Sequence, residues 1–255
     1  MSASPAEPNL PRPVLRRLAD AWPSQTPARR LAGLRAAVPG RLVLTTSFGP
    51  EDQALTHLIV EAGLDIALVT LDTGRLFPQT HELWEQTEQH YGIRIASAHP
   101  APDALAGLLA ADGANGFYRS VAARHACCDV RKRVPLRAAL HGAAGWITGL
   151  RADQSAGRGT LEYISIDPEL AVLKANPLRD WSRAELEGFI AAHQVPVNRL
   201  HAQGFASIGC APCTRAIAPG EPERAGRWWW EQDDARECGL HVGADGKLLR
   251  KAAIA

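Results

Sequence analysis

Short apolar runs alternate with helix-like segments along the middle of the chain, and this alternation sets the tightest limit on its fold. The run RLVLTTSFG at 41–49 is rich in β-branched residues and ends in glycine, which is typical of a strand that enters a loop. The segment 50–63 predicts a helix, since it has Pro50 at its start, two acidic residues in its first turn and Gly63 after its end. Further strands are expected at 65–74, 93–100, 144–150 and 170–178, and a further helix at 77–92. Strands that alternate with helices predict an α/β protein whose mostly parallel sheet has helices on both faces.

The 255 residues fit one large α/β domain, with an ordinary globular balance of 46% hydrophobic and 22% charged residues. We expect that domain at 15–215, after a proline-rich and disordered N-terminal tail at 1–14. Beyond about residue 200 the sequence becomes rich in glycine, proline and charge. We therefore expect 216–255 to be a mobile C-terminal segment and not an independent domain, with a short helix near RWWWE at 227–231.

Charge and hydropathy exclude several classes of protein. The formal net charge of +1 gives no argument for a nucleic-acid partner. The start MSASPAEPNLPRP lacks the basic and apolar regions of a secretory signal, and no apolar run approaches membrane-spanning length. These features predict a cytoplasmic protein with reduced thiols, in which an odd number of cysteines favours metal binding or catalysis over a disulfide framework.

The loop TSFGPED joins the first predicted strand to its helix and is a candidate anion site. The start of a helix offers free backbone N–H groups and a partial positive charge, which suit phosphate or sulfate. An ordinary strand-to-helix turn is the alternative, and the loop is not a Walker loop because the lysine is missing. The candidate residues are Ser47, Phe48 and Gly49.

Two later loops carry polar residues at the ends of predicted strands. LDTGRLFP supplies Asp72, Thr73, Gly74 and Arg75, which could hold a ribose, an adenine edge or an anion. Its alternative is an Asx turn that caps a helix. GLRADQSAGR supplies Arg151, Asp153, Gln154, Ser155 and Arg158, which suit an anionic substrate, although a solvated loop would have the same composition.

Four of the five cysteines occur in pairs, Cys127–Cys128 in HACCDVRKRVPL and Cys210–Cys213 in GCAPCTR. We expect the first pair at the head of a helix. Four thiolates can hold an iron–sulfur cluster, whereas a vicinal pair fits a zinc ribbon poorly. A thioredoxin-like dithiol at the second pair leaves the first unexplained, and burial as small hydrophobic residues is a further alternative. Lys132 could balance an anionic cluster and substrate, or coat a helix.

The fifth cysteine, Cys238, stands alone in DDARECGLH, with His241 three residues further on. A lone thiol can attack an electrophile, but an external dithiol must then regenerate it. His241 could tune this thiol or bind an anion. Arg224 and Arg227 lie upstream in ERAGRWWW, whose tryptophans are expected to be packing anchors.

Taken together, these motifs resemble the phosphoadenylyl-sulfate and adenylyl-sulfate reductase family of sulfate assimilation, from about residue 41 to residue 241. The motifs, in the family's order, are SFGPED, LDTGRLFPQT, CCDVRK, GLRADQS, CAPCTR, RAGRWWWE and ECGLH. The resemblance implies an adenine nucleotide α-hydrolase-like fold, related to the ATP pyrophosphatases. The chain is similar to the branch with both cysteine pairs, which generally reduces adenylyl sulfate and not its 3′-phosphorylated form.

The resemblance also implies roles for the candidate residues. Cys238 would attack the sulfur of adenylyl sulfate, AMP would leave, and thioredoxin or a glutaredoxin-like dithiol would release sulfite from the S-sulfocysteine. The four paired cysteines would hold a 4Fe-4S cluster that positions substrate and tunes charge, with Lys132 between cluster and substrate. Arg224, Arg227 and His241 would bind the phosphosulfate, and a homo-oligomer is allowed.

Three alternatives stay open at this point. The same chemistry could act on phosphoadenylyl sulfate. A sulfurtransferase that thiolates RNA would need an intact pyrophosphate loop, which SFGPEDQ alters. A redox-sensing nucleotide-binding module would use the cluster as its sensor, but Cys238 and its neighbouring arginines argue against it.

Overall fold

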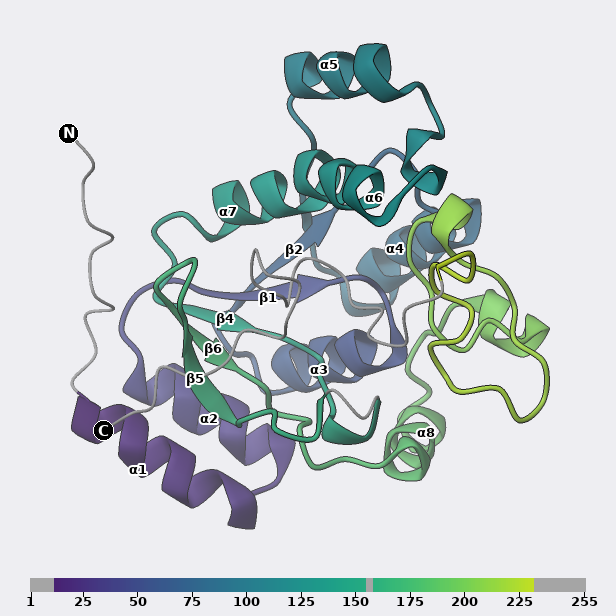
Figure 1. Ribbon diagram of the computed structural model, residues 1–255. Coiled ribbons are helices and arrows are strands. Elements are labelled where there is room, and N and C mark those ends of the chain that lie inside the picture. The colour runs from purple at the N-terminus through teal and green to yellow at the C-terminus, as the bar shows by residue number, and fades with distance from the viewer. Residues whose placement is uncertain (1–11, 155–157, 232–255) are drawn as a thin grey trace, which may run out of the picture.

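A six-stranded sheet forms the centre of the computed structural model, which describes residues 12–154 and 158–231 (Figure 1). The strand order is β3-β2-β1-β4-β6-β5, and neighbouring strands are parallel except for the β5–β6 pair. The strands are β1 Leu42–Thr46, β2 Ala67–Leu71, β3 Ala96–Ala98, β4 Gly145–Ile147, β5 Ile164–Asp167 and β6 Val172–Ala175. The predicted, mostly parallel sheet is thereby confirmed.

Helices cover both faces of this sheet, with α6 and α7 over one face and α1, α2 and α3 over the other (Figure 1). The α-helices are α1 Arg12–Ala21, α2 Pro27–Ala37, α3 Pro50–Glu61, α4 Pro78–Tyr91, α5 Pro102–Asp112, α6 Val121–Cys128, α7 Val134–Leu140 and α8 Arg183–Ala192. Short 3-10 turns lie at Trp22–Ser24, Gly116–Tyr118, Ala152–Gln154, Arg199–Gln203 and Ala211–Cys213. Among these described helices, none has the length and apolar character to cross a membrane.

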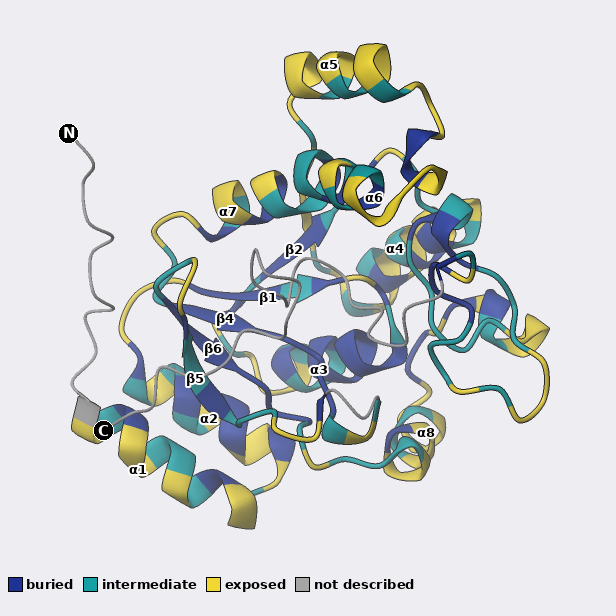
Figure 2. Cartoon of the chain, in the orientation of Figure 1, coloured by how far each residue is buried: buried dark blue, intermediate teal, exposed yellow. Residues whose placement is uncertain are grey.

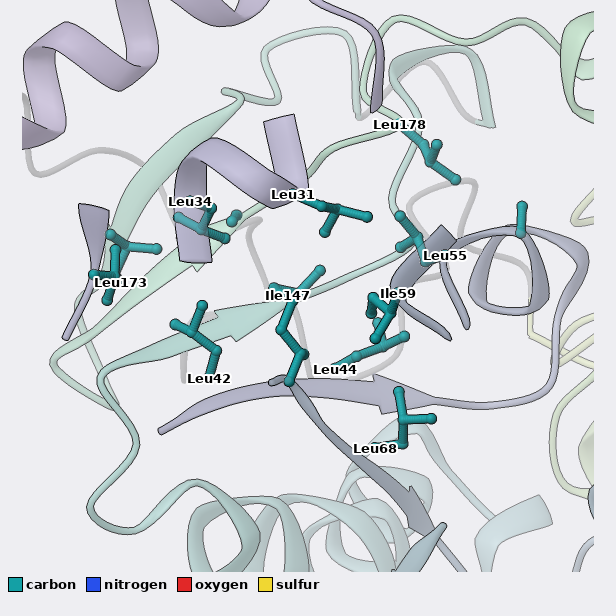
Figure 3. Close-up of a cluster of buried hydrophobic side chains, with 14 of the residues drawn as sticks. Leu31, Leu34, Leu42, Leu44, Leu55, Ile59, Leu68, Ile147, Leu173 and Leu178 are labelled. Carbon is teal, nitrogen blue, oxygen red and sulfur yellow. The ribbon is translucent and has the colours of Figure 1, made fainter. Parts of the chain in front are cut away.

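The core lies on both sides of the sheet because successive side chains of a strand point to opposite faces. On β1, Leu42 and Leu44 join the larger cluster beneath the sheet, whereas Val43 joins a smaller one with Trp146 and Leu136. Figure 3 shows the larger cluster, in which strand side chains meet those of α2 and α3. Strands β1, β4 and β6 are almost wholly buried, while β3 at the edge of the sheet and α5 are largely exposed (Figure 2).

A π-helix at Asp129–Arg133 joins α6 to α7 without a break in the helical path. Pro135 lies near the start of α7 and has no N–H to donate, and its ring would collide with the carbonyl of Arg131 in a regular α-helix. Widening the turn before the proline relieves this collision. Lys132 lies in this π-helix, and π-turns within longer helices frequently occur at functional sites.

Three features that the sequence predicts differ in the structure. Helix α1 begins at Arg12, inside the expected tail at 1–14. The vicinal cysteines end α6 and do not begin a helix, because Ser120 caps that helix eight residues earlier by accepting from the backbone N–H of Ala123. The RWWWE segment forms turns and a bridge between Thr214 and Arg227 in place of a helix.

The bridge at Thr214 also bears on the C-terminal segment. Arg215 donates its backbone N–H to Gly226 at 3.0 Å, and Trp228 donates to Cys213 at 3.3 Å. The described part of this segment therefore returns to the cysteine loop and packs on the main domain. Cys238, His241 and Ser155 lie outside the described residues.

Candidate active site

A cleft of about 210 Å³ opens at the carboxyl ends of β1, β2 and β4, where ligands bind in open parallel sheets. The loops after these strands line it together with the π-helix and stretches of the chain between 201 and 227. The predicted substrate-binding residues that line the cleft are Ser47, Phe48, Gly49, Thr73, Lys132, Gln154, Arg224 and Arg227.

The loop after β1 is held against the first turn of α3. The Asp52 carboxylate accepts hydrogen bonds from the backbone N–H of Ser47 at 2.7 Å and from its hydroxyl at 2.8 Å. Phe48 has a φ of 60°, which is rare for an aromatic residue, and its ring stacks on Trp84 at 5.8 Å. Gly49 is the N-cap of α3, so the N-terminal end of this helix borders the cleft and suits an anionic group.

Basic side chains converge on the cleft from three separate parts of the chain. Lys132 comes from the π-helix, Arg158 from the loop after β4, and Arg224 and Arg227 from the C-terminal segment. Arg227 is only 6% exposed, and its Nε has no hydrogen-bond partner among the described residues. A buried arginine donor without a partner suits an anionic ligand, since guanidinium groups bind phosphate and sulfate in planar geometry.

Gly209 makes room for this arginine. A Cβ at position 209 would lie 2.2 Å from a terminal nitrogen of Arg227, so only glycine lets the guanidinium lie against the backbone here. The guanidinium carbon also lies 4.6 Å from the Trp228 ring centroid. Backbone and tryptophan thus fix the side chain in place at the cleft.

Three predicted site residues of the β2 loop do not line the cleft. Asp72 accepts from the Gly74 backbone N–H at 2.9 Å, which is the Asx turn weighed as the alternative. Arg75 points elsewhere, donating to the Ala114 carbonyl at 3.0 Å and to the Asn115 side chain at 2.6 Å. Of the predicted site residues in this loop, Thr73 alone lines the cleft.

Arg151, expected to bind substrate, is instead fully buried among carboxylates. Its guanidinium pairs with Glu51 at 2.9 Å, with Glu223 at 3.4 Å and with Asp153. These partners belong to the start of α3, the loop after β4 and the C-terminal segment. Arg151 and Asp153 therefore join three parts of the cleft wall and do not line it.

All four paired cysteines line a second, smaller cavity beside the cleft. Cys128, Cys210 and Cys213 are buried and Cys127 is half-buried. The hydroxyl of Thr73 lies 3.3 Å from the Cys210 sulfur. The remaining lining residues are Arg75, Phe117, Arg124, Arg131, Lys132, Pro212, Arg227 and Trp228. Lys132 and Arg227 line both cavities, so they lie between the thiols and the cleft.

These four thiols could hold an iron–sulfur cluster, since they surround one cavity. Burial raises the pKa of Cys213 to about 12 and that of Cys127 above its ordinary value, so neither is a ready nucleophile. In the described part of the chain, no three His, Cys, Asp or Glu side chains converge on one metal-ion position. Four thiols match in number the ligands of a 4Fe-4S cubane, in which each cysteine binds a different iron.

A buried ion pair anchors the end of the described chain beside the cysteine cavity. Arg124 of α6 donates to both carboxylate oxygens of Glu231, at 2.8 and 2.9 Å, and both side chains are 4% exposed. Trp228 lies under the Arg124 guanidinium at 4.8 Å. Cys238 follows Glu231 by seven positions in sequence and lies outside the described residues.

Sequence reasoning misses several residues of the cleft, among them Glu223 and His201. Both lie in the region beyond residue 200, whose composition indicates loops. Neither residue has a pattern that marks it for the cleft, and the place of Glu223 depends on its contact with the distant Arg151.

Residues 41–216 match the model of the phosphoadenosine phosphosulfate reductase domain. The chain is 53% identical to adenosine 5′-phosphosulfate reductase of Agrobacterium fabrum, over 86% of this chain and 84% of that protein. It is 54% identical to the protein of the same name from Allochromatium vinosum, over 78% of each chain.

Solved structures share the fold at lower identity. Phosphoadenylyl-sulfate reductase from Candida auris, in a phosphate complex, superposes with a TM-score of 0.69 at 22% identity and covers 85% of this chain and 100% of that one. Yeast FAD synthetase superposes with a TM-score of 0.51 at 14% identity, covering 80% and 75%. These likenesses support the expected adenine nucleotide α-hydrolase-like fold.

Proposed function

The chain belongs to the phosphoadenosine phosphosulfate reductase family, and from this membership we propose how its residues carry out the reaction. It reduces adenosine 5′-phosphosulfate to sulfite and AMP in sulfate assimilation. The observation that carries the proposal is that Lys132 and Arg227 line both the cleft and the four-cysteine cavity. A substrate anion between them would lie beside the cysteines and within reach of the segment that carries Cys238.

The substrate has two chemically different ends, the charged phosphosulfate and the adenosine, and each would bind a different part of the cleft. Lys132, Arg158, Arg224 and Arg227 supply positive charge for the phosphosulfate, and His241 joins them from the C-terminal segment. The N-terminal end of α3 adds free backbone N–H groups. The loops around Ser47 and Thr148 line the rest of the cleft and would take the adenosine.

Cys238 is the nucleophile. Its thiolate attacks the sulfur of the sulfonyl group, the bond from that sulfur to the phosphate oxygen breaks, and the electron pair leaves with AMP. The product on the protein is S-sulfocysteine. A thiolate of thioredoxin, or of a glutaredoxin-like dithiol, then attacks the Cys238 sulfur and sulfite leaves with the bonding pair. The second thiol of the dithiol closes its own disulfide and returns Cys238 to the reduced state.

Cys127, Cys128, Cys210 and Cys213 fit the four ligands of a 4Fe-4S cluster, because they line one cavity and are mostly buried. When bound, such a cluster would fix the cysteine loop against α6 and set the electrostatic field next to the substrate anion. The chain's own cations, Arg131 and Lys132, would balance its charge.

Mass spectrometry of the enzyme with substrate and no dithiol tests the proposal. One SO₃ group, about 80 Da, should be added on Cys238, with one AMP released per chain. Reduced thioredoxin should restore the original mass and release sulfite. Cys238→Ser should form no adduct and still bind AMP. An adduct on Cys210 or Cys213, or substantial turnover by Cys238→Ser, would overturn the assignment.

A further inference from the structure

His201 lies in the 3-10 turn Arg199–Gln203, between α8 and the cysteine loop, and its side chain lines the cleft. Its Nδ1 lies 2.7 Å from the carbonyl oxygen of Phe205. A carbonyl oxygen only accepts hydrogen bonds, so Nδ1 carries the proton. In the neutral ring, Nε2 is then a lone-pair acceptor.

This acceptor is buried and has no hydrogen-bond partner among the described residues. Burial lowers the pKa of His201, and the nearby Arg183 lowers it further, whereas the Phe205 bond and Glu51 raise it. The ring is therefore neutral at physiological pH. Native proteins rarely leave a buried acceptor unpaired, so its presence in the lining of a cleft requires an explanation.

We propose that His201 Nε2 accepts a hydrogen bond from the adenosine part of the bound nucleotide. The inference rests on the proposed function, because the substrate's chemistry selects the contact. At neutral pH the phosphosulfate has only acceptor oxygens, and the donors of the molecule are the 6-amino group and the two ribose hydroxyls. The Glu51 carboxylate near His201 also disfavours an anionic group at this position.

His201→Asn isolates the contact. An asparagine amide can replace Nδ1 and keep the bond to the Phe205 carbonyl, but it has no atom at the Nε2 position. AMP should bind this variant about five- to tenfold more weakly, as expected for one lost hydrogen bond to a neutral donor. His201→Gln can present its amide oxygen near Nε2 and should recover part of the affinity. Turnover at saturation should stay unchanged while the Michaelis constant rises.

Calorimetric titration with AMP analogues identifies the donor. The three probes are 2′-deoxy-AMP, 3′-deoxy-AMP and purine riboside 5′-monophosphate, which lacks the 6-amino group. The analogue without the contacted donor should bind wild type and His201→Asn equally, whereas the other two should keep the five- to tenfold difference. That pattern supports the contact and identifies which group of the nucleotide donates the hydrogen bond.

Two results would overturn the proposal. One is equal AMP affinity of wild type and His201→Asn. The other is an undiminished difference for all three analogues, which would assign His201 a purely structural role. Failure of the wild-type protein to bind AMP at all would count against the proposed function instead, so the two failures are distinguishable.

Discussion

Asp52 joins the two loops that form the floor of the cleft. It accepts from the backbone and the hydroxyl of Ser47, and its Oδ1 leaves no space for a side chain at Gly149, where a Cβ would lie 2.5 Å away. Burial is the largest influence on this carboxyl and raises its pKa from 3.8 to about 6, despite the hydrogen bonds from Ser47. The cleft thus contains an acid that titrates close to neutral pH.

This raised pKa predicts a pH-dependent stability. Between pH 3.8 and about 6 the folded protein keeps the Asp52 proton that the unfolded chain has released. The free energy of unfolding should therefore fall as pH rises through this window, since the folded state binds more protons. Urea unfolding from pH 4 to pH 7 measures the fall. Asp52→Asn should show a smaller decrease over this range, and an identical pH dependence in both proteins would contradict the assignment.

Gly209 gives a second test at the scale of one residue. Gly209→Ala places a Cβ where the Arg227 guanidinium lies, so the arginine must move away from both cavities. AMP and substrate should bind about tenfold or more weakly, because an ion pair to a buried anion is lost. Gly188 on the exposed side of α8 is the matched control, since a Cβ added there would have no atom within 4 Å. Gly188→Ala should keep full affinity and gain about 0.5–1 kcal/mol of stability.

At the scale of elements, the sequence predicts the parallel strands and α3 well because their signals are local. β-Branched runs end in glycine, and Pro50 with two acidic residues marks a helix start. The antiparallel β5 has no such signal, since its four residues pair with β6 through a tight turn in which Ala171 has a φ of 50°. Helix α8 is absent from the sequence prediction although Ser182 and Glu185 form a capping box.

The site is only partly predictable for a physical reason. An arginine in a polar loop can face a ligand or a carboxylate, and the choice depends on contacts far away in sequence. Arg227 faces the cleft, whereas Arg151 pairs with Glu51, a hundred positions earlier. The cysteines are predictable because few functions require four thiols arranged in two pairs.

The ion pairs of Arg151 with Glu51, Asp153 and Glu223 predict that losing Arg151 lowers both stability and AMP affinity. Arg151→Met removes the cation that Glu51 and Glu223 share and leaves Glu223 with Arg183 at 3.6 Å, which should cost about 3–5 kcal/mol of stability. Since Glu223 precedes Arg224, the variant should also weaken AMP binding. Arg30 is the matched control, because it is equally buried and pairs with Asp180 away from the cleft. Arg30→Met should lose stability by denaturant unfolding and keep the AMP affinity of wild type. Unchanged AMP affinity in Arg151→Met would show that the network does not position Arg224.

At the scale of the whole molecule, the two sides of the site are stabilised differently. The sheet and the helices beneath it share a large apolar core (Figure 3). The region around the cysteines has a small cluster of Phe117, Cys210, Cys213 and Trp228, supplemented by the Arg124–Glu231 pair. A bound cluster would therefore contribute a larger share of stability to this region than to the sheet.

Removing the cluster should loosen one part of the molecule and leave the rest intact. Anaerobically purified protein should contain about four irons and four sulfides per chain, and Cys210→Ser should lose them. Without these bonds, α6 and the cysteine loop are joined mainly by the Arg124–Glu231 pair and Trp228. Amide hydrogen exchange should therefore speed up at 121–133 and 204–231, while the strands and α2 keep their protection.

The same loosening should weaken AMP binding, because Lys132 and Arg227 line both cavities and depend on the cysteine loop for their positions. Cys238→Ser is the control, since it leaves the four paired cysteines in place and should retain iron, exchange protection and AMP affinity. Stoichiometric zinc in place of iron would refute the cluster. Iron loss with unchanged exchange would instead show that the ion pair and tryptophan alone hold the cysteine region, and that the cluster serves the chemistry without supporting the fold.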